Sequence, residues 1–179
     1  MAGSIFEPDR SGSTKVERHT MAVVVDNEPG VLARVVGLFS GRGYNIESLT
    51  VTTISEDEKE SRISLVTSGT PMIIDQIKAQ LERLVPVSGV HDLTEEGPYI
   101  EREIALIKVV ATGEERRESL RIADIFRASV ADTTTESFVF VVTGSKEKID
   151  SFTHLMRALG NVEVARSGAV AIARGSEVL

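Results

Sequence analysis

The sequence of 179 residues contains no cysteine and no tryptophan, and only 4% of its residues are aromatic. Without cysteine the chain has no disulfide scaffold, no thiolate-bound zinc or iron–sulfur centre and no thiol nucleophile. Because aromatic side chains are scarce, we expect a core of valine, isoleucine, leucine and alanine. Hydrophobic residues make up 41% of the chain, which is typical of soluble globular proteins.

Positive charge and long apolar runs are also scarce. The chain has 20 Lys and Arg against 27 Asp and Glu, a net charge of −7, which argues against nucleic acid or an anionic membrane as the main partner. No apolar run approaches the ~20 residues of a membrane span. Residues 1–18 carry acidic side chains and no apolar stretch, so we expect a flexible tail and not a signal peptide.

From His19 onward, strand-like and helix-like segments alternate. A β-branched run at 22–25 stops at the turn-forming residues 26–30, and a helix follows. Pro29 fits the first helical turn because its missing N–H has no helical partner there. Gly43 is predicted to end the helix as a left-handed cap. Helical spacing predicts a buried face of Leu32, Val35, Val36 and Phe39.

A second helix follows two further strands. The pattern predicts strands over 44–54 and 62–66, joined by an acidic hairpin tip at 56–60. Thr70 and Pro71 are suited to begin the next helix. A strand over 85–93 then completes the order βαββαβ. The predicted buried face of the second helix consists of Ile74, Ile77, Leu81 and Leu84.

The second half of the chain repeats this order. A shift of 75 positions places 61–87 on 136–162 without gaps, and Gly69 and Thr70 fall on Gly144 and Ser145. The first helix needs a shift of 87, which places Val35, Val36, Leu38 and Phe39 on Ile122, Ala123, Ile125 and Phe126.

We therefore predict an α+β fold of two ferredoxin-like βαββαβ domains over 19–95 and 96–179. Each is expected to be a four-stranded antiparallel sheet with two helices on one face. The other face has no helices, yet the strands at 21–25 and 138–142 are apolar at more than alternate positions. This face is therefore expected to need cover from another copy of the fold, in a second subunit or a partner protein.

Catalytic constellations are missing from the sequence. His19, His91 and His154 lack the spacing that begins a metal site on one helix or strand. There is no Gly-x-Ser-x-Gly elbow and no phosphate loop. The Gly41-Arg42-Gly43 run ends a helix and has Ile46 where a dinucleotide fingerprint needs glycine. We expect no enzymatic activity and no metal site in this chain.

One segment has the features of a binding site. Residues 26–30 lie between a strand and a helix N-terminus, where unpaired backbone N–H groups favour an anion. Gly30 leaves room for a carboxylate, and the Asn27 amide can accept from an ammonium group. Val31 and Leu32 add apolar surface. Together these groups describe a branched-chain amino acid, and the alternative is a tight turn without a ligand.

Three stretches resemble one family. DNEPGVLARVVGLFSGRGYNIESLTV at 26–51 is similar to the ACT regulatory domain of the acetolactate synthase small subunit. YIEREIALIKV at 99–109 and VEVARSGAVAIARG at 162–175 match the same family, so the resemblance covers about 19–175. A generic ACT domain shares the topology but lacks the GLFSGRGYNIESL run and the second domain.

The resemblance implies a cytoplasmic regulatory subunit that is not itself an enzyme. Its partner would be the catalytic large subunit of acetolactate synthase, a transferase that joins two pyruvates, or pyruvate and 2-oxobutyrate, on the route to branched-chain amino acids. That large subunit is expected to carry thiamine diphosphate, Mg²⁺ and FAD, and this chain no cofactor. The small subunit would activate the large one and confer feedback inhibition by a branched-chain amino acid, usually valine.

The resemblance also implies where the effector binds, namely between the ACT domains of a homodimer. Asn27 and Gly30 match the family's loop for the polar end of the amino acid. Asn45 and Ile46 match the start of a second strand that the neighbouring subunit contributes. Pro29 occupies a position that varies in the family.

Two other classes of protein remain as alternatives. One is a stand-alone ACT-type amino-acid sensor without a catalytic partner. The other is an RNA-binding module of the same topology, which would need exposed aromatics and a basic surface, whereas the chain has six Phe, two Tyr and a charge of −7.

Overall fold

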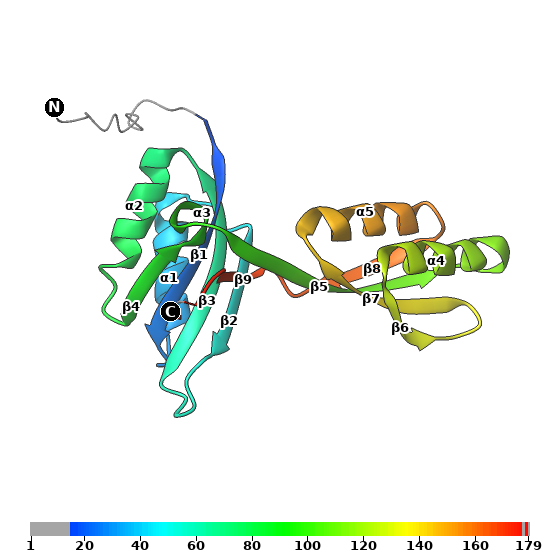
Figure 1. Cartoon of the computed structure of the whole chain (residues 1–179), viewed down its shortest axis with the longest axis horizontal. Helices are drawn as coiled ribbons and strands as arrows, with labels where there is room; N and C mark the ends of the chain where they lie inside the picture. Colours follow the sequence, from blue (N-terminus) through cyan, green and yellow to red (C-terminus); the bar gives the residue numbers. More distant parts are fainter. Residues whose placement is uncertain (1–14, 177, 179) are drawn as a thin grey trace. The chain divides into compact units, whose positions relative to one another are not determined.

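The computed structural model describes residues 15–176 and 178 (Figure 1). Residues 1–14, the greater part of the predicted tail, lie outside this description. The chain divides into two compact units between Pro98 and Tyr99, whereas the sequence placed the boundary after Glu95. Glu17 and Arg18, which the sequence assigned to the tail, pair with Gly69 and its neighbour as the first residues of a strand. The first domain therefore begins earlier than predicted.

Unit 1 has the predicted order βαββαβ followed by one short helix. Its four strands form an antiparallel sheet in the order β2-β3-β1-β4. Asp92 is the N-cap of the short helix, and its carboxylate accepts a hydrogen bond from the Thr94 N–H. The elements are β1 (Glu17–Asp26), α1 (Val31–Arg42), β2 (Ser48–Thr53), β3 (Glu60–Gly69), α2 (Pro71–Leu81), β4 (Val87–Asp92) and α3 (Leu93–Glu96).

Unit 2 repeats the order and the topology, with the sheet β6-β7-β5-β8, and adds a strand that the sequence did not predict. This strand, β9, pairs with the first four residues of β5, which extend beyond the pairing of β5 with β7 and β8. The elements are β5 (Tyr99–Val110), α4 (Gly113–Phe126), β6 (Ser129–Thr133), β7 (Ser137–Gly144), α5 (Lys146–Arg157), β8 (Asn161–Arg166) and β9 (Val170–Ala173).

Each unit has its own core between the sheet and its two helices (Figure 1). The core of unit 1 is aliphatic as predicted, apart from Met21 and Phe39. The core of unit 2 differs from the prediction because Phe140 and Phe152 lie at its centre, with ring centroids 5.9 Å apart, and Phe126 packs against Phe152. The few aromatic residues are thus concentrated in one of the two cores.

The second helix of each unit confirms the repeat. Ile74, Ile77 and Leu81 of α2 are fully buried, and so are their counterparts in α5, Ile149, Phe152 and Met156. Leu84 packs against the unit 1 core just after α2. The shift of 75 therefore relates equivalent residues.

The first helix differs from its predicted face. Helix α1 buries Val31, Val35, Leu38 and Phe39, while Leu32 and Val36 are 38% and 40% exposed. Apolar residues fill two adjacent faces of this helix, so periodicity alone selected the wrong one. Pro29 lies before the helix, and Gly30 is its N-cap.

The shift of 87 for this helix is wrong. It places the buried Leu38 on Ile125, which is 76% exposed. The left-handed caps Gly43 and Arg127 match at a shift of 84, which places Val35 and Phe39 on the buried residues Ser119 and Ala123.

Among the described residues, no helix is long and apolar enough to cross a membrane.

Candidate functional site

The loop predicted to bind the effector joins β1 to α1, and Asn27 holds it in place. The Asn27 N–H donates to the carbonyl oxygen of Lys59 at 2.7 Å, and Nδ2 donates to that of Glu58 at 2.8 Å. Both acceptors lie at the tip of the β2–β3 hairpin. The Oδ1 atom of Asn27 has no partner among the described residues, so it can accept a hydrogen bond from a ligand ammonium group.

Gly30 gives this loop its open shape. Its φ of 88° is left-handed, and a Cβ built there would meet nothing within 4 Å. The first turn of α1 contains no acidic residue, and in the described part of the chain no acceptor contacts the backbone N–H of Leu32 or Ala33. The helix N-terminus therefore offers free donors and a positive partial charge to a small carboxylate.

Val31 does not take part in this surface through its side chain. It is 6% exposed and belongs to the unit 1 core. Its N–H donates to the carbonyl oxygen of Glu28 at 3.3 Å. The exposed apolar side chain beside the loop is that of Leu32, with Val36 one turn further along α1.

Asn45 and Ile46 lie between α1 and β2, before the strand in which the sequence placed them. The Asn45 side chain is exposed, and its backbone carbonyl accepts from Thr67 Oγ1 at 2.6 Å. Ile46 is partly buried against the unit 1 core.

The structure does not bring these two groups together within one chain. Asn45 is bonded to Thr67, which pairs with His19 near the start of β1. Asn27 follows the other end of that strand. Eight residues separate the two positions on β1, which corresponds to about 26 Å at 3.3 Å per residue. A single amino acid can touch both groups only if they come from different chains.

A second polar cluster in unit 1 joins residues far apart in the sequence. His19 Nδ1 lies 2.8 Å from Asp92 Oδ2, both side chains are buried, and Glu95 lies close to them. Lys78 Nζ contacts Glu95 at 2.6 Å. Burial alone would lower the pKa of Lys78, but Glu95 and its acidic neighbours outweigh this effect and raise it. The Lys78 ammonium group thus stays positively charged beside Glu95. The cluster joins β1, β4, α2 and α3.

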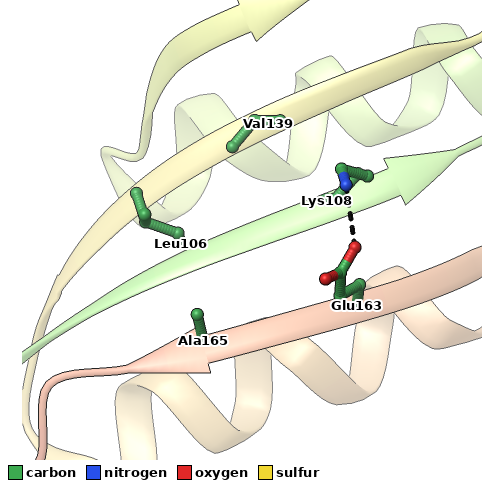
Figure 2. Close-up of a pocket in the computed structure, with 5 residues that line it drawn as sticks. All are labelled: Leu106, Lys108, Val139, Glu163 and Ala165. Carbon is green, nitrogen blue, oxygen red and sulfur yellow. Dashed lines mark hydrogen bonds and ion pairs between the residues drawn. The ribbon is translucent and has the colours of Figure 1, made fainter.

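Unit 2 has a shallow hollow on the sheet face away from its helices (Figure 2). Its volume is about 190 Å³, and strands β5, β7 and β8 contribute its lining. Lys108 Nζ and Glu163 Oε2 are 2.8 Å apart across β5 and β8. Their hydrogen bond raises the pKa of Lys108 and lowers that of Glu163. The lining residues are Leu106, Lys108, Val139, Glu163 and Ala165.

Comparison with known proteins gives the family. Residues 21–88 match a family model described as an AHAS small subunit-like ACT domain, and residues 102–175 match one described as the small subunit of acetolactate synthase. A probable acetolactate synthase small subunit of Archaeoglobus fulgidus is 45% identical over 160 residues, which cover 89% of this chain and 99% of that protein. The chain belongs to the acetolactate synthase small-subunit family.

Further members of the small-subunit family agree in length and fold. The small subunit of acetolactate synthase isozyme 3 from Escherichia coli is 42% identical over 163 residues, covering 90% of this chain and 99% of that protein. The crystal structure of the acetolactate synthase small subunit from Thermotoga maritima matches with a TM-score of 0.79 at 36% identity, over 90% and 99% of the two chains. The resemblance and the α+β fold of two similar domains inferred from the sequence are therefore confirmed.

Proposed function

We propose that this chain is the non-catalytic regulatory subunit of an acetolactate synthase, and that it confers feedback inhibition by a branched-chain amino acid, valine before leucine or isoleucine. Membership of the small-subunit family over both units supports the partnership with a catalytic subunit. The thiamine diphosphate, Mg²⁺ and FAD would be bound by that partner. One observation supports the effector site. Asn27 and Gly30 follow one end of β1 and Asn45 lies near the other end, so a ligand that contacts both groups must join two chains.

In this proposal two ACT domains form a homodimer around the effector. The ligand carboxylate lies at the N-terminus of α1 beside Gly30, and the ammonium group donates to Asn27 Oδ1. The neighbouring chain contributes the Asn45 amide and the aliphatic surface of Ile46. These groups match the polar and apolar parts of valine, and none of them is an acid or base suited to catalysis.

Inhibition then follows from coupling between two binding equilibria. Valine favours the dimer arrangement that closes the site, and the catalytic subunit is activated better by another arrangement. Each ligand therefore weakens the binding of the other by the same factor. A factor of about ten to a hundred, or about 1.4–2.8 kcal/mol, is enough for a graded feedback response.

The test is titration calorimetry of the full chain with valine, leucine and isoleucine, together with activity assays after reconstitution with the catalytic subunit. Asn45→Ala should weaken valine binding at least about tenfold and leave activation intact, because its exposed side chain makes no contact needed for folding. Asn161→Ala, at an exposed asparagine in unit 2, is the matched control. Gly30→Asp is less informative because a side chain at φ 88° is strained whatever it does to the ligand.

Three outcomes separate the alternatives. Absence of binding to all three amino acids would contradict the effector site. Valine binding without any activation of, or association with, the catalytic subunit would instead identify a stand-alone sensor. If Asn45→Ala abolishes activation as well as inhibition while the fold is preserved, the separation of the two roles is wrong.

A further inference from the structure

Helices α1 and α2 lie side by side on one face of the unit 1 sheet, with a groove between them (Figure 1). The groove has a volume of about 440 Å³. Helix α1 contains no acidic residue, and the one acidic residue of α2, Asp75, lies 3.6 Å from Lys78. Positive charge is therefore gathered here in a chain whose net charge is −7. We call this surface the arginine groove, and its lining residues are Arg34, Leu38, Arg42, Gln80, Arg83 and Leu84.

Two of the three arginines of the groove have no counter-ion among the described residues. Arg34 Nη1 lies 3.1 Å from Glu28 Oε1. Arg42 and Arg83 are exposed, and in the described part of the chain no carboxylate contacts either of them. Glu82, the C-cap of α2, does not line the groove. The arginine groove therefore presents uncompensated positive charge, which favours an acidic partner.

A buried hydrogen-bond acceptor in the groove also lacks a partner. Gln76 and Gln80 lie one turn apart on α2. Gln76 Oε1 accepts a hydrogen bond from the Tyr44 hydroxyl at 3.2 Å, whereas Gln80 Oε1 is buried and accepts none from the described residues. An acceptor that has lost its water and gained no donor is unfavourable. A partner that supplies an N–H group to Gln80 removes this cost.

The spread of the charges favours a polypeptide segment over a single small anion. Arg34 and Arg42 are eight residues apart on α1, which corresponds to about 12 Å along the helix. The ion pair with Glu28, which precedes α1, directs Arg34 away from Arg42. One phosphate or carboxylate group is too small to contact both ends of such a groove. An extended segment of about four residues spans this distance, and its backbone carries the N–H groups that Gln80 lacks.

Helix α1 also connects the groove to the proposed effector sites. It begins after Gly30, which belongs to one effector site, and it ends at Arg42, three residues before Asn45 of the other site. A rigid helix that contacts each of two ligands is a physical route for coupling between them. Feedback inhibition needs coupling between the effector and the catalytic subunit, so the position of the groove favours that subunit as its occupant.

We propose that the arginine groove binds an acidic segment of the catalytic subunit. Carboxylates of that segment meet Arg42 and Arg83, and one of its backbone N–H groups donates to Gln80 Oε1. This inference rests on the proposed function, because it assigns a surface to the partnership with the catalytic subunit.

Charge reversal tests the arginine groove in the full chain. Arg42→Glu combined with Arg83→Glu should weaken association with the purified catalytic subunit at least about tenfold, measured by titration of its activation. Valine binding, measured by calorimetry, should persist because neither residue belongs to the effector site. Arg157→Glu combined with Arg174→Glu is the matched control, since it reverses two exposed arginines of unit 2 and changes the net charge equally. This control should associate like the unmodified chain.

A second variant leaves all charges in place. Gln80→Met removes the buried acceptor, so we expect the free chain to become more stable in urea unfolding and its association to weaken about fivefold. A residue with only a structural role would not shift these two quantities in opposite directions. The variant also leaves the last turn of α1 unchanged, where Arg42→Glu places a carboxylate against the helix dipole.

The outcomes separate this inference from the proposed function. If the unmodified chain neither binds nor activates the catalytic subunit, the proposed function fails and the inference fails with it. If the unmodified chain does both, and the groove variants associate equally well, the proposed function stands and the arginine groove is not the docking site.

Two further results would identify another occupant and overturn the inference. If the groove variants lower the mass of the free chain in light scattering, a second copy occupies the groove. If inorganic pyrophosphate binds the unmodified chain and not the doubly substituted one, while association is unchanged, the groove is a site for a small anion.

Discussion

Replacement of Arg166 by methionine tests how unit 2 stabilises a buried charge. Glu103, on β5, is 5% exposed, and its carboxylate accepts two hydrogen bonds from the Arg166 guanidinium group, the one from Nε at 2.9 Å. Arg166 also contacts Asp150 at 2.5 Å. Removal of one partner of a buried ion pair costs about 3–5 kcal/mol because the remaining charge has no counter-ion.

We therefore expect Arg166→Met to lower the free energy of unfolding of unit 2 by about 3–5 kcal/mol. For a unit of this size, that corresponds to a decrease of roughly 12–40 °C in Tm.

Urea unfolding followed by circular dichroism measures this loss. The double variant Glu103→Met and Arg166→Met removes both charges and should recover most of the stability, because an apolar pair of similar volume can replace a buried ion pair. Arg174→Met is the control, since Arg174 is exposed and no carboxylate among the described residues pairs with it. A loss below 1 kcal/mol, or a double variant as unstable as the single one, would refute the reasoning.

Three further predictions concern single side chains. Gly160→Ala should destabilise the chain by about 3 kcal/mol in thermal unfolding, because the new Cβ would lie 2.1 Å from the Val110 carbonyl oxygen. Gly41→Ala is the control: its Cβ would meet nothing within 4 Å, so it should stabilise the chain by about 0.5–1 kcal/mol. Hydrogen bonds from Lys146 and Arg166 lower the pKa of Asp150. The stabilisation that the Asp150 carboxylate contributes is therefore present at neutral pH and lost as the pH falls through that lowered pKa. Urea unfolding curves of Asp150→Asn and of the unmodified chain should differ at pH 7 and converge near pH 2. Ser145→Ala should cost about 1 kcal/mol in urea unfolding because the hydroxyl caps α5, and an unchanged midpoint would argue against the cap.

The fold could be predicted where the apolar pattern of a segment allowed only one interpretation. The apolar residues of α2 and α5 form one stripe each, so the shift of 75 aligned their buried faces correctly. Helix α1 has apolar residues on two adjacent faces, and only packing on the sheet distinguishes Leu38 from Val36. Strand β9 has four residues and exists because β5 extends beyond its other partners, which no local pattern indicates.

The candidate site likewise contains features that could be predicted from the sequence and features that could not. The loop before α1 and the room at Gly30 could be predicted locally, whereas the positive φ of Gly30 as the N-cap was not predicted, because the sequence placed Pro29 in the first helical turn. The burial of Val31 depends on the rotation of α1, which the sequence did not determine. His19 and Asp92 are 73 residues apart, and the hollow beside Lys108 is lined from three strands, so neither grouping has a signal in the order of residues.

The repetition of one sheet topology in both units has a consequence for how this chain can be altered. In each strand the helix-side core fixes only every second residue, because side chains alternate between faces. The exposed residues among the intervening ones can therefore be exchanged without disturbing the core, whereas Ala22 and Val66, at 0% and 1% exposure, cannot. Exchange of only these exposed alternate positions between the two sheets would change the surface that a domain offers to a partner and leave its core unchanged.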